Sequence, residues 1–155
     1  GKHRTTEQAN IELAAARAES KTIVFTNGCF DIIHAGHIHL LRAAKDLGDV
    51  LVLGLNTDDS IKRLKGHDRP VHSQDDRVTV LSELEAVDIV VTFDDDTPLD
   101  LIQALKPDII VKGDDYTRDT VVGADLVESW GGRVELVTLL EGRSTSSAIE
   151  RIRAS

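Results

Sequence analysis

Two histidines, His34 and His37, stand three residues apart with Gly36 between them, directly after a short run of β-branched and aromatic residues. Residues three apart on a helix share one face, so the two rings converge if a helix begins near Ala35. The N-terminus of such a helix offers unpaired N–H groups and the positive end of the helix dipole. We therefore interpret this motif as a site for an anion such as a phosphate group.

Two other interpretations of the histidines stay open on the sequence alone. Both rings can be ordinary core or surface groups, or they can be ligands of a metal ion. A zinc site needs three or four ligands, whereas His39 points elsewhere on the helix and Asp31 is the only nearby carboxylate. We predict no metal site of the protein's own. Magnesium would arrive on a nucleotide and be held mostly by the nucleotide's phosphates.

Cys29 is the single cysteine of the chain, which excludes an intrachain disulfide and agrees with a reducing compartment. Its closeness to His34 raises the alternative of a thiolate nucleophile, which needs a neighbouring base and an electropositive pocket. We favour the simpler interpretation, in which Cys29 is a small buried residue whose backbone N–H faces a ligand.

A second candidate anion site lies near the end of the sequence, in "EGRSTSSAI" from Glu141 to Ile149. Capping a helix needs one hydroxyl, but here Gly142 and Arg143 precede four consecutive hydroxyl residues. Such a donor-rich helix start predicts a phosphate cradle. The chain has no Walker lysine pattern, and no G-x-G-x-x-G follows the first predicted strand, which disfavours P-loop kinases and dinucleotide enzymes.

Two charged loops and one basic stretch add to the candidates. "KGDDY", from Lys112 to Tyr116, is either a polar turn or a loop that recognises a base through its backbone and covers it with Tyr116. The acidic run Asp94–Asp96 is interpreted as a solvated turn before a helix start. A basic opening for an anionic small molecule is predicted from five cations close together in sequence: Lys62, Arg63, Lys65, Arg69 and Arg77.

The order of the predicted elements indicates an α/β fold. Short apolar stretches predict strands at Thr22–Thr26, Val50–Leu55, Asp88–Thr92, Asp108–Val111 and Arg133–Thr138. Helices are predicted at Thr5–Glu19, Ile38–Leu47, Asp58–Leu64, Asp75–Leu84, Leu99–Leu105, Val121–Trp130 and Ser146–Arg153. This alternation predicts a Rossmann-like open parallel sheet of about five strands with helices on both faces. Ligands of such sheets bind at the carboxyl ends of the strands. The loops that carry the candidate residues follow these strand ends, and the loop Phe93–Thr97 is one of them.

Length and charge limit the classes of protein. The chain has 155 residues, a net charge of -9 and no apolar run long enough to cross a membrane. An acidic average surface would repel a phosphate backbone, so nucleic acid is not an expected partner. The opening "GKHRTTEQAN" lacks the apolar region of a secretory signal, and we expect a cytoplasmic protein. We expect residues 1–20 to form a leading helix that packs outside the main domain, 21–155. This helix is a candidate for a homodimer contact.

Several motifs resemble those of a known family. "FTNGCFDIIHAGHIHLL" resembles the H-x-G-H signature of the cytidylyltransferase-like nucleotidyltransferase superfamily, and "GRSTSSAI" resembles its second, Ser/Thr-rich signature. More narrowly, "LNTDDSIKRLKGHDRPV", "LEAVDIVVTFDDDTP" and "LKPDIIVKGDDY" are similar to the bacterial D-glycero-β-D-manno-heptose 1-phosphate adenylyltransferases, which often form the C-terminal half of a bifunctional kinase/adenylyltransferase. The likeness runs from Lys21 to Arg153.

The resemblance implies transfer of AMP from ATP, with its Mg²⁺, to a sugar 1-phosphate, giving ADP-heptose and pyrophosphate for lipopolysaccharide or another surface glycan. It implies catalytic roles for His34, His37 and Lys65. The expected nucleotide-binding residues are Asn27, Gly28, Cys29, Phe30, Gly36, Asn56, Asp58, Lys112, Gly113, Asp114, Tyr116, Arg143, Ser144, Thr145 and Ser146. The expected substrate-binding residues are Asp31, Lys62, Arg63, Arg69 and Arg77.

Three alternatives accompany this hypothesis of direct in-line transfer. A cytidylyltransferase of the glycerol phosphate branch would carry an arginine where this chain has Leu139 or Leu140, which favours the adenylyl branch. A nucleotide-binding module without turnover would bind ATP and release no pyrophosphate. Covalent catalysis through Cys29 would depend on its thiolate.

Overall fold

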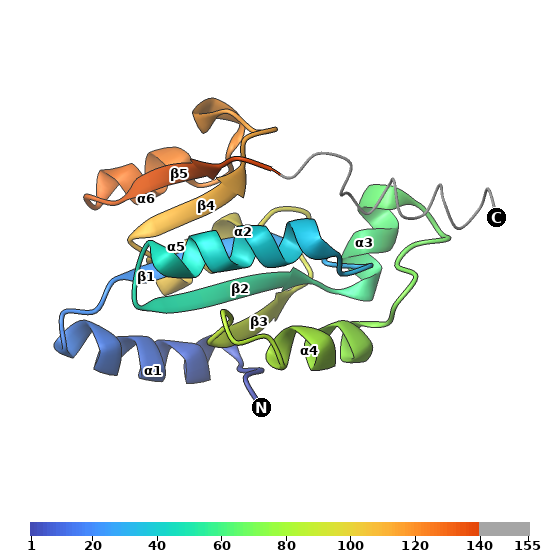
Figure 1. The fold of residues 1–155 in the computed structure, drawn as a ribbon, viewed down its shortest axis with the longest axis horizontal. Helices are drawn as coiled ribbons and strands as arrows, with labels where there is room; N and C mark the ends of the chain where they lie inside the picture. The colour runs from blue at the N-terminus through green and yellow to red at the C-terminus, as the bar shows by residue number, and fades with distance from the viewer. Residues whose placement is uncertain (140–155) are drawn as a thin grey trace.

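The computed structural model describes residues 1–139, and these alternate between strands and helices along the chain (Figure 1). The strands are β1 (Ile23–Gly28), β2 (Val50–Asn56), β3 (Ile89–Phe93), β4 (Ile109–Gly113) and β5 (Arg133–Val137). The helices are α1 (Thr6–Ala18), α2 (Ala35–Asp46), α3 (Asp58–Lys65), α4 (Gln74–Ser82), α5 (Leu99–Leu105), the 3₁₀ helix η1 (Arg118–Thr120) and α6 (Ala124–Ser129).

The strands form one parallel sheet in the order β3-β2-β1-β4-β5, which confirms the predicted Rossmann-like α/β fold. The order reverses at β1, whose neighbours are β2 and β4, so the chain builds the sheet outward in two directions from this strand. Pairing with β2 carries β1 two residues past its predicted end, because Asn27 lies opposite Gly54 and Gly28 opposite Leu55. The crevice at the carboxyl ends of β1 and β4 is the expected ligand position in such a sheet.

Alternation of side chains divides the core into two layers. Ile23 and Phe25 of β1 face a cluster that includes residues of α1, α5 and α6, whereas Val24 faces a cluster that includes residues of α2 and α4. Successive residues of a strand point to opposite faces, so a strand buried on both faces is apolar throughout. This is why the strands were recognisable as short continuous apolar stretches.

Helix α1 corrects one prediction, because it does not pack outside the main fold. Its residues Ala9 and Leu13 are fully buried and belong to the same core cluster as Phe25. The chain before α1 also pairs with the edge of the sheet: the Arg4 N–H donates to the Val90 carbonyl (2.9 Å), and the Val90 N–H donates to the Lys2 carbonyl (2.9 Å). Residues 1–20 are therefore part of the α/β domain, and the apolar face of α1 is occupied within the protein.

Capping groups set where the helices begin. The predicted capping box of α1 is present, since the Gln8 N–H donates to the Thr5 hydroxyl and the Thr5 N–H to the Gln8 side chain. The helix predicted over Val121–Trp130 is shorter, because Gly123 adopts a left-handed conformation (φ 86°) and α6 starts only after it. The helix predicted at Ser146–Arg153 lies outside the described residues.

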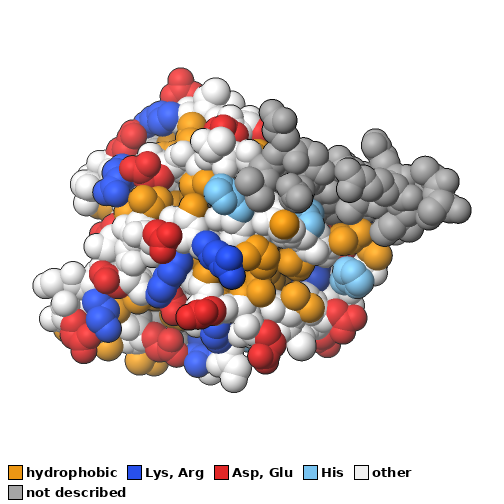
Figure 2. All heavy atoms as spheres, in the orientation of Figure 1, with side chains coloured by type: hydrophobic (Ala, Val, Ile, Leu, Met, Phe, Trp, Pro, Cys, Tyr) orange, Lys and Arg blue, Asp and Glu red, His pale blue; other side chains and the backbone are white. Residues whose placement is uncertain are grey.

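The surface shows no segregation of charge on the face drawn in Figure 2. Acidic and basic side chains are interspersed there, and hydrophobic side chains gather between α2 and α4. Within residues 1–139, no helix combines the length and the apolar character that a membrane crossing requires.

Candidate functional site

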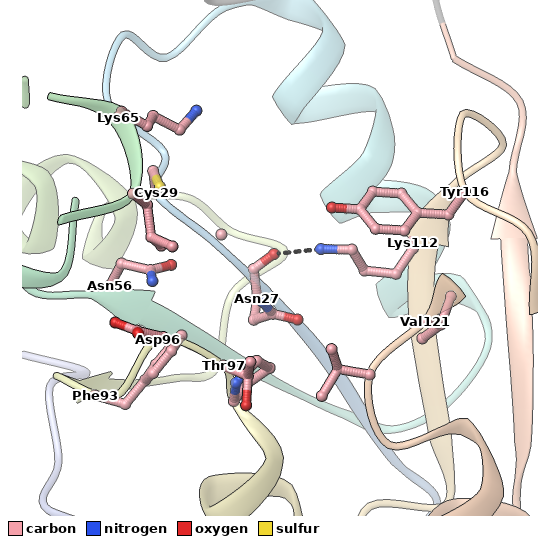
Figure 3. Close-up of a pocket in the computed structure, with 14 residues that line it drawn as sticks. Asn27, Cys29, Asn56, Lys65, Phe93, Asp96, Thr97, Lys112, Tyr116 and Val121 are labelled. Carbon is pink, nitrogen blue, oxygen red and sulfur yellow. Dashed lines mark hydrogen bonds between the residues drawn. The ribbon is translucent and has the colours of Figure 1, made fainter. Parts of the chain in front are cut away.

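A cavity of about 350 Å³ opens at the carboxyl edge of the sheet, where the strand order reverses (Figure 3). Lys112 and Tyr116 form one wall, Asn56 and Thr97 belong to the opposite wall, and Asn27 lies between them. The further described residues that line it are Gly28, Cys29, Leu64, Lys65, Phe93, Asp96, Pro98, Val121 and Val122. We call this the main cavity; its position agrees with the rule for ligands of open parallel sheets.

A smaller hollow of about 170 Å³ adjoins the main cavity and shares Asn27, Gly28, Cys29 and Lys65 with it. Its other described lining residues are Phe30, Asp31, His37, Leu40 and Arg69. The hollow therefore joins the loop after β1, the start of α2 and the segment after α3. Of the predicted catalytic residues, His37 and Lys65 lie on its wall, and Lys65 reaches both spaces.

The two histidines converge at the N-terminus of α2, as the spacing predicts, with ring centroids 3.9 Å apart. His34 is the N-cap residue: its Nδ1 accepts a hydrogen bond from the Gly36 N–H (3.0 Å). His37 reaches back, and its Nδ1 accepts from the His34 backbone N–H (3.1 Å). A neutral imidazole whose Nδ1 accepts carries its proton on Nε2. Both rings are thus arranged as Nε2–H donors.

His37 stays uncharged at neutral pH. Its pKa is lowered from 6.5 to about 4, chiefly by burial and in addition by the neighbouring His34 and Lys65. An uncharged ring is a poor proton acceptor on the Nε2 side, because that nitrogen already bears hydrogen. The arrangement suits donation of a hydrogen bond to an anion and does not suit a general base.

The loop between β1 and α2 depends on close packing around Gly28 and Phe30. A Cβ at Gly28 would lie 2.9 Å from the Phe30 ring, so a larger residue would displace that ring. Phe30 adopts a positive φ of 45°, which is rare for an aromatic residue, and its ring lies 5.3 Å from that of His37. Gly28 and Phe30 therefore position the histidine that lines the hollow.

Cys29 lies on the wall of both spaces, but its surroundings do not favour a thiolate. Burial raises the pKa of its thiol, and the opposing charges of Lys65, Arg77 and Arg69 are smaller influences. A reactive cysteine requires the opposite shift. The structure therefore supports the simpler interpretation of Cys29 as a lining residue, and it weighs against covalent catalysis.

The loop after β4 brings a cation and an aromatic ring to the main cavity. The Lys112 ammonium donates to the Asn27 carbonyl (3.0 Å) and lies 4.7 Å from the centre of the Tyr116 ring. Burial lowers the pKa of Lys112, although the carboxylate of Asp115 opposes this. Next to it, the Asp114 carboxylate accepts a hydrogen bond from the Leu139 N–H. Neither Asp114 nor Gly113 lines the main cavity or the hollow. The nucleotide contacts of Asp114, Gly113 and Gly36 stay predictions.

Arg77 was predicted to bind substrate, and the structure corrects this. Its side chain is 1% exposed, and it donates to the carbonyls of Cys29 (2.8 Å), Asn56 (2.8 Å) and His72 (3.1 Å). It also pairs with the carboxylate of Asp58 (2.8 Å), whose nucleotide contact stays a prediction. With its donors used by protein groups, Arg77 braces the loops that frame the site.

The remaining members of the basic stretch have different positions. Arg63 pairs with Asp96 (3.1 Å) and donates to the Asp94 carbonyl on the exposed side of α3, so it too has protein partners where a substrate contact was predicted. Lys62 is exposed and lines neither space. Arg69 lines the hollow and pairs with Asp31 (2.9 Å). Of these cations, Lys65 and Arg69 are the ones that face the two spaces.

The loop after β3 contributes lining residues that the sequence interpretation missed. Asp96 and Thr97 line the main cavity, so the acidic run Asp94–Asp96 is not only a solvated turn. The rule that ligands lie at the carboxyl ends of strands already pointed to Phe93–Thr97, and it was the better guide. Arg143, Ser144, Thr145 and Ser146, the predicted second phosphate cradle, lie outside the described residues.

The donor set of the described residues does not fit a resident metal ion. No group of three or more His, Cys, Asp or Glu side chains within residues 1–139 is arranged to hold one. Asp96 is the sole carboxylate among the described residues of the main cavity, and it is already paired with Arg63. A cation carried by the phosphates of a nucleotide needs few protein ligands, and it is compatible with these walls.

Comparison with known proteins gives the chain close relatives. The "Bifunctional protein HldE" of Syntrophotalea carbinolica is 58% identical over 151 residues, which are 97% of this chain and 31% of that protein. The protein of the same name from Geobacter sulfurreducens is 56% identical over 140 residues, which are 90% of this chain and 29% of that protein. The one from Mesorhizobium japonicum is 59% identical over 142 residues, which are 92% of this chain and 29% of that protein. The chain thus spans about three-tenths of the length of these relatives.

A solved structure and a family model agree with these relatives. The lipopolysaccharide core biosynthesis protein from Thermoplasma volcanium is 32% identical, with a TM-score of 0.63 over 77% of this chain and 97% of that one. The model described as Cytidylyltransferase-like matches residues 25–150, a span that holds the histidine pair, both spaces and the Ser/Thr-rich segment. The chain therefore belongs to the cytidylyltransferase-like family, and it is a nucleotidyltransferase.

Proposed function

We propose that this chain transfers AMP from ATP to D-glycero-β-D-manno-heptose 1-phosphate and releases pyrophosphate. The observation that carries the proposal is the neutral Nε2–H imidazole of His37 at the N-terminus of α2, on the wall of the hollow that adjoins the main cavity where the strand order reverses. The names of the relatives support a sugar phosphate as acceptor, since they include a lipopolysaccharide core biosynthesis protein. We place the reaction in the cytoplasm, where ATP is available.

The reaction is a direct in-line displacement. An oxygen of the sugar phosphate forms a bond to the α-phosphorus of ATP, the bond from that phosphorus to the bridging oxygen breaks, and pyrophosphate leaves with the electron pair. The attacking phosphate is already ionised at neutral pH, so no general base is required. The protein has to hold two anions together and stabilise charge on the equatorial and leaving oxygens, and preorganised donors do this.

The described residues divide this work. His37 lies on the wall of the hollow, where its Nε2–H group would donate to the α-phosphate, and Lys65 brings positive charge to the wall shared by both spaces. His34 lines neither space; its backbone N–H holds the His37 ring, and its own catalytic role stays a prediction. Mg²⁺ bound to ATP would neutralise part of the phosphate charge. In the main cavity, Asn27, Asn56 and Thr97 provide polar groups of the kind that contact sugar hydroxyls.

A pyrophosphate-release screen tests the proposal. It crosses ATP, CTP, GTP and UTP with heptose 1-phosphate, glycerol phosphate and pantetheine phosphate on the purified chain. We expect turnover to be highest with ATP and the sugar 1-phosphate. Preference for CTP with glycerol phosphate would assign the chain to the cytidylyl branch, and nucleotide binding without pyrophosphate release from any pair would exclude an enzyme acting on these substrates.

His37→Ala tests the role of the histidine pair within this reaction. Loss of one preorganised donor is expected to lower kcat by about a hundredfold to a thousandfold. His39→Ala is the matched control, because His39 lies on the same helix but contacts the Thr138 carbonyl (2.9 Å) and lines neither space. Near-normal turnover by His37→Ala would show that the α2 N-terminus does not stabilise the transition state.

A further inference from the structure

Arg69 holds a buried donor that no described residue satisfies. Its Nε donates to an Asp31 carboxylate oxygen at 2.9 Å, and its side chain is 12% exposed. Its Nη2 atom is buried and has no hydrogen-bond partner within residues 1–139. It is the one buried side-chain nitrogen or oxygen of the described chain in this condition. A buried donor without an acceptor is destabilising, and more so when it is charged, so this position calls for an acceptor.

Asp31 fixes the orientation of this guanidinium. Its carboxylate also accepts from the backbone N–H groups of Val71 (2.7 Å) and His72 (2.8 Å). Burial alone would raise the pKa of Asp31, but the hydrogen bonds from His72, Val71 and Arg69 together hold it below its ordinary value. The carboxylate is therefore ionised and occupied by protein donors. It acts as an anchor and not as the substrate ligand predicted from the sequence, and it does not supply the missing acceptor of Nη2.

The hollow around Arg69 is suited to an anion. Its other polar side chains include the Lys65 ammonium and the His37 ring, an Nε2–H donor. The single carboxylate on its described wall, that of Asp31, already accepts hydrogen bonds from three protein donors. At about 170 Å³ the hollow is smaller than the cavities that hold whole ligands, and it opens beside the larger space. These properties fit one phosphate group of a larger substrate.

We propose that this hollow is a phosphate subsite, in which Arg69 Nη2 donates to a phosphate oxygen of a substrate and Asp31 is the residue that positions Arg69. Guanidinium groups match phosphate geometry, and a charge-assisted hydrogen bond would satisfy the buried donor. The inference rests on the proposed function, because that reaction brings in two phosphate-bearing substrates. The shared chemistry is a phosphate group, which belongs either to the sugar phosphate or to the nucleotide.

Steady-state kinetics with Arg69→Gln distinguish the two sources. A lost hydrogen bond to a charged group corresponds to about 1.5–3 kcal/mol, so we expect a roughly 10- to 150-fold rise in one KM. A rise in the KM for the sugar 1-phosphate assigns the subsite to the acceptor, and a rise in the KM for ATP assigns it to the nucleotide. Arg118→Gln is the matched control, since Arg118 is also held by carboxylates but lies away from both spaces. Unchanged KM values for both substrates would overturn the proposal.

Direct binding of inorganic phosphate separates this proposal from the proposed function. We expect the Kd for phosphate, measured by calorimetry on the whole chain, to rise at least about tenfold in Arg69→Gln and to stay unchanged in Arg118→Gln. Arg69→Lys keeps the charge but loses the planar set of guanidinium donors, so its Kd for phosphate should lie between those of Arg118→Gln and Arg69→Gln. If wild-type protein turns over no sugar 1-phosphate, the proposed function fails, whereas equal phosphate binding by wild type and by a folded Arg69→Gln or Arg69→Lys variant would overturn the subsite.

Discussion

The proton on His37 decides what the start of α2 offers to an anion. A charged imidazolium would attract a phosphate more strongly, but burial and the neighbouring His34 and Lys65 make that form of His37 unfavourable in the free protein. The His34 backbone N–H, donating to Nδ1, then directs the remaining proton of the neutral ring to Nε2. A neutral imidazole can carry its proton on either ring nitrogen, and this single backbone hydrogen bond selects the tautomer that donates from Nε2.

We predict that His37 in the free protein titrates with a pKa of about 4 and is the Nε2–H tautomer above it. Between pH 6.5 and 4 the unfolded chain binds a proton at this residue and the folded chain does not, so its contribution to stability falls as pH falls through this window. Allowing for partial exposure, the loss by pH 4 is about 2 kcal/mol.

Imidazole ¹⁵N shifts measured across this pH range, with His37→Gln used for assignment, give both the tautomer and the pKa. The unfolding free energy of His37→Gln should lack the same pH-dependent component. A titration of His37 near pH 6.5, or an Nδ1–H tautomer at pH 7, would show that the ring is not held as a neutral Nε2–H donor.

Arg77 connects elements that are distant in the sequence. The carbonyls and the carboxylate that it contacts belong to the loop after β1, the end of β2, the start of α3 and the segment before α4. Carbonyls at the ends of parallel strands lack ladder partners beyond the sheet, and here one buried guanidinium satisfies two of them. The framework of the main cavity thus depends on a side chain that lines neither the cavity nor the hollow.

We predict that Arg77→Gln lowers the free energy of unfolding by about 3–5 kcal/mol, because it leaves buried carbonyls without donors and Asp58 without its partner. Urea unfolding followed by circular dichroism measures this change. Arg118→Gln serves as the control, since the ion pairs of Arg118 are exposed and their loss should change the free energy of unfolding much less. A loss below about 1 kcal/mol in Arg77→Gln would mean that water or neighbouring groups replace the guanidinium, and that it is not a brace.

The molecule as a whole has a core that extends from α1 across the sheet to α2 and α4. One cluster contains apolar residues of α1, α5 and α6, and the other contains those of α2 and α4, with the strands between them. The N-terminal segment closes the β3 edge through backbone hydrogen bonds, which protects an edge that would otherwise present unpaired groups. The leading helix is therefore a structural part of the domain. Its buried apolar face packs against the core and is not available for the predicted homodimer contact.

Leu13→Ala tests this arrangement of the core. Leu13 is fully buried in the cluster that contains Phe25, and its truncation should cost about 2–5 kcal/mol of stability. Ile11→Ala, on the same helix, is the matched control, because Ile11 is 73% exposed and its truncation should stay within about 0.5 kcal/mol. Thermal or urea unfolding gives both values. Equal, small effects of the two variants would mean that α1 is detached from the core in solution.

The local signals in the sequence were sufficient for the sheet and for much of the site. Apolar stretches gave the strands to within about two residues, and the strand-end rule placed Asn27, Asn56 and Lys112 at one edge. The spacing of the histidines predicted their convergence, because a helix turn relates residues three apart without help from the rest of the chain. These features depend on residues that are close in the sequence, so the spacing of apolar residues and of the histidines is enough to predict them.

Only the tertiary structure decided which basic side chains line the hollow and which are buried among protein groups. Arg69 and Arg77 belong to one basic stretch, and nothing in their spacing distinguishes a guanidinium that faces a hollow from one that is fully buried. Their partners Asp31 and Cys29 lie 38 and 48 residues away, and contacts at such separations depend on how the whole chain closes. The burial of α1 has the same origin: an alanine-rich helix can cover a sheet or stand apart, and only the shape of the finished core selects between them.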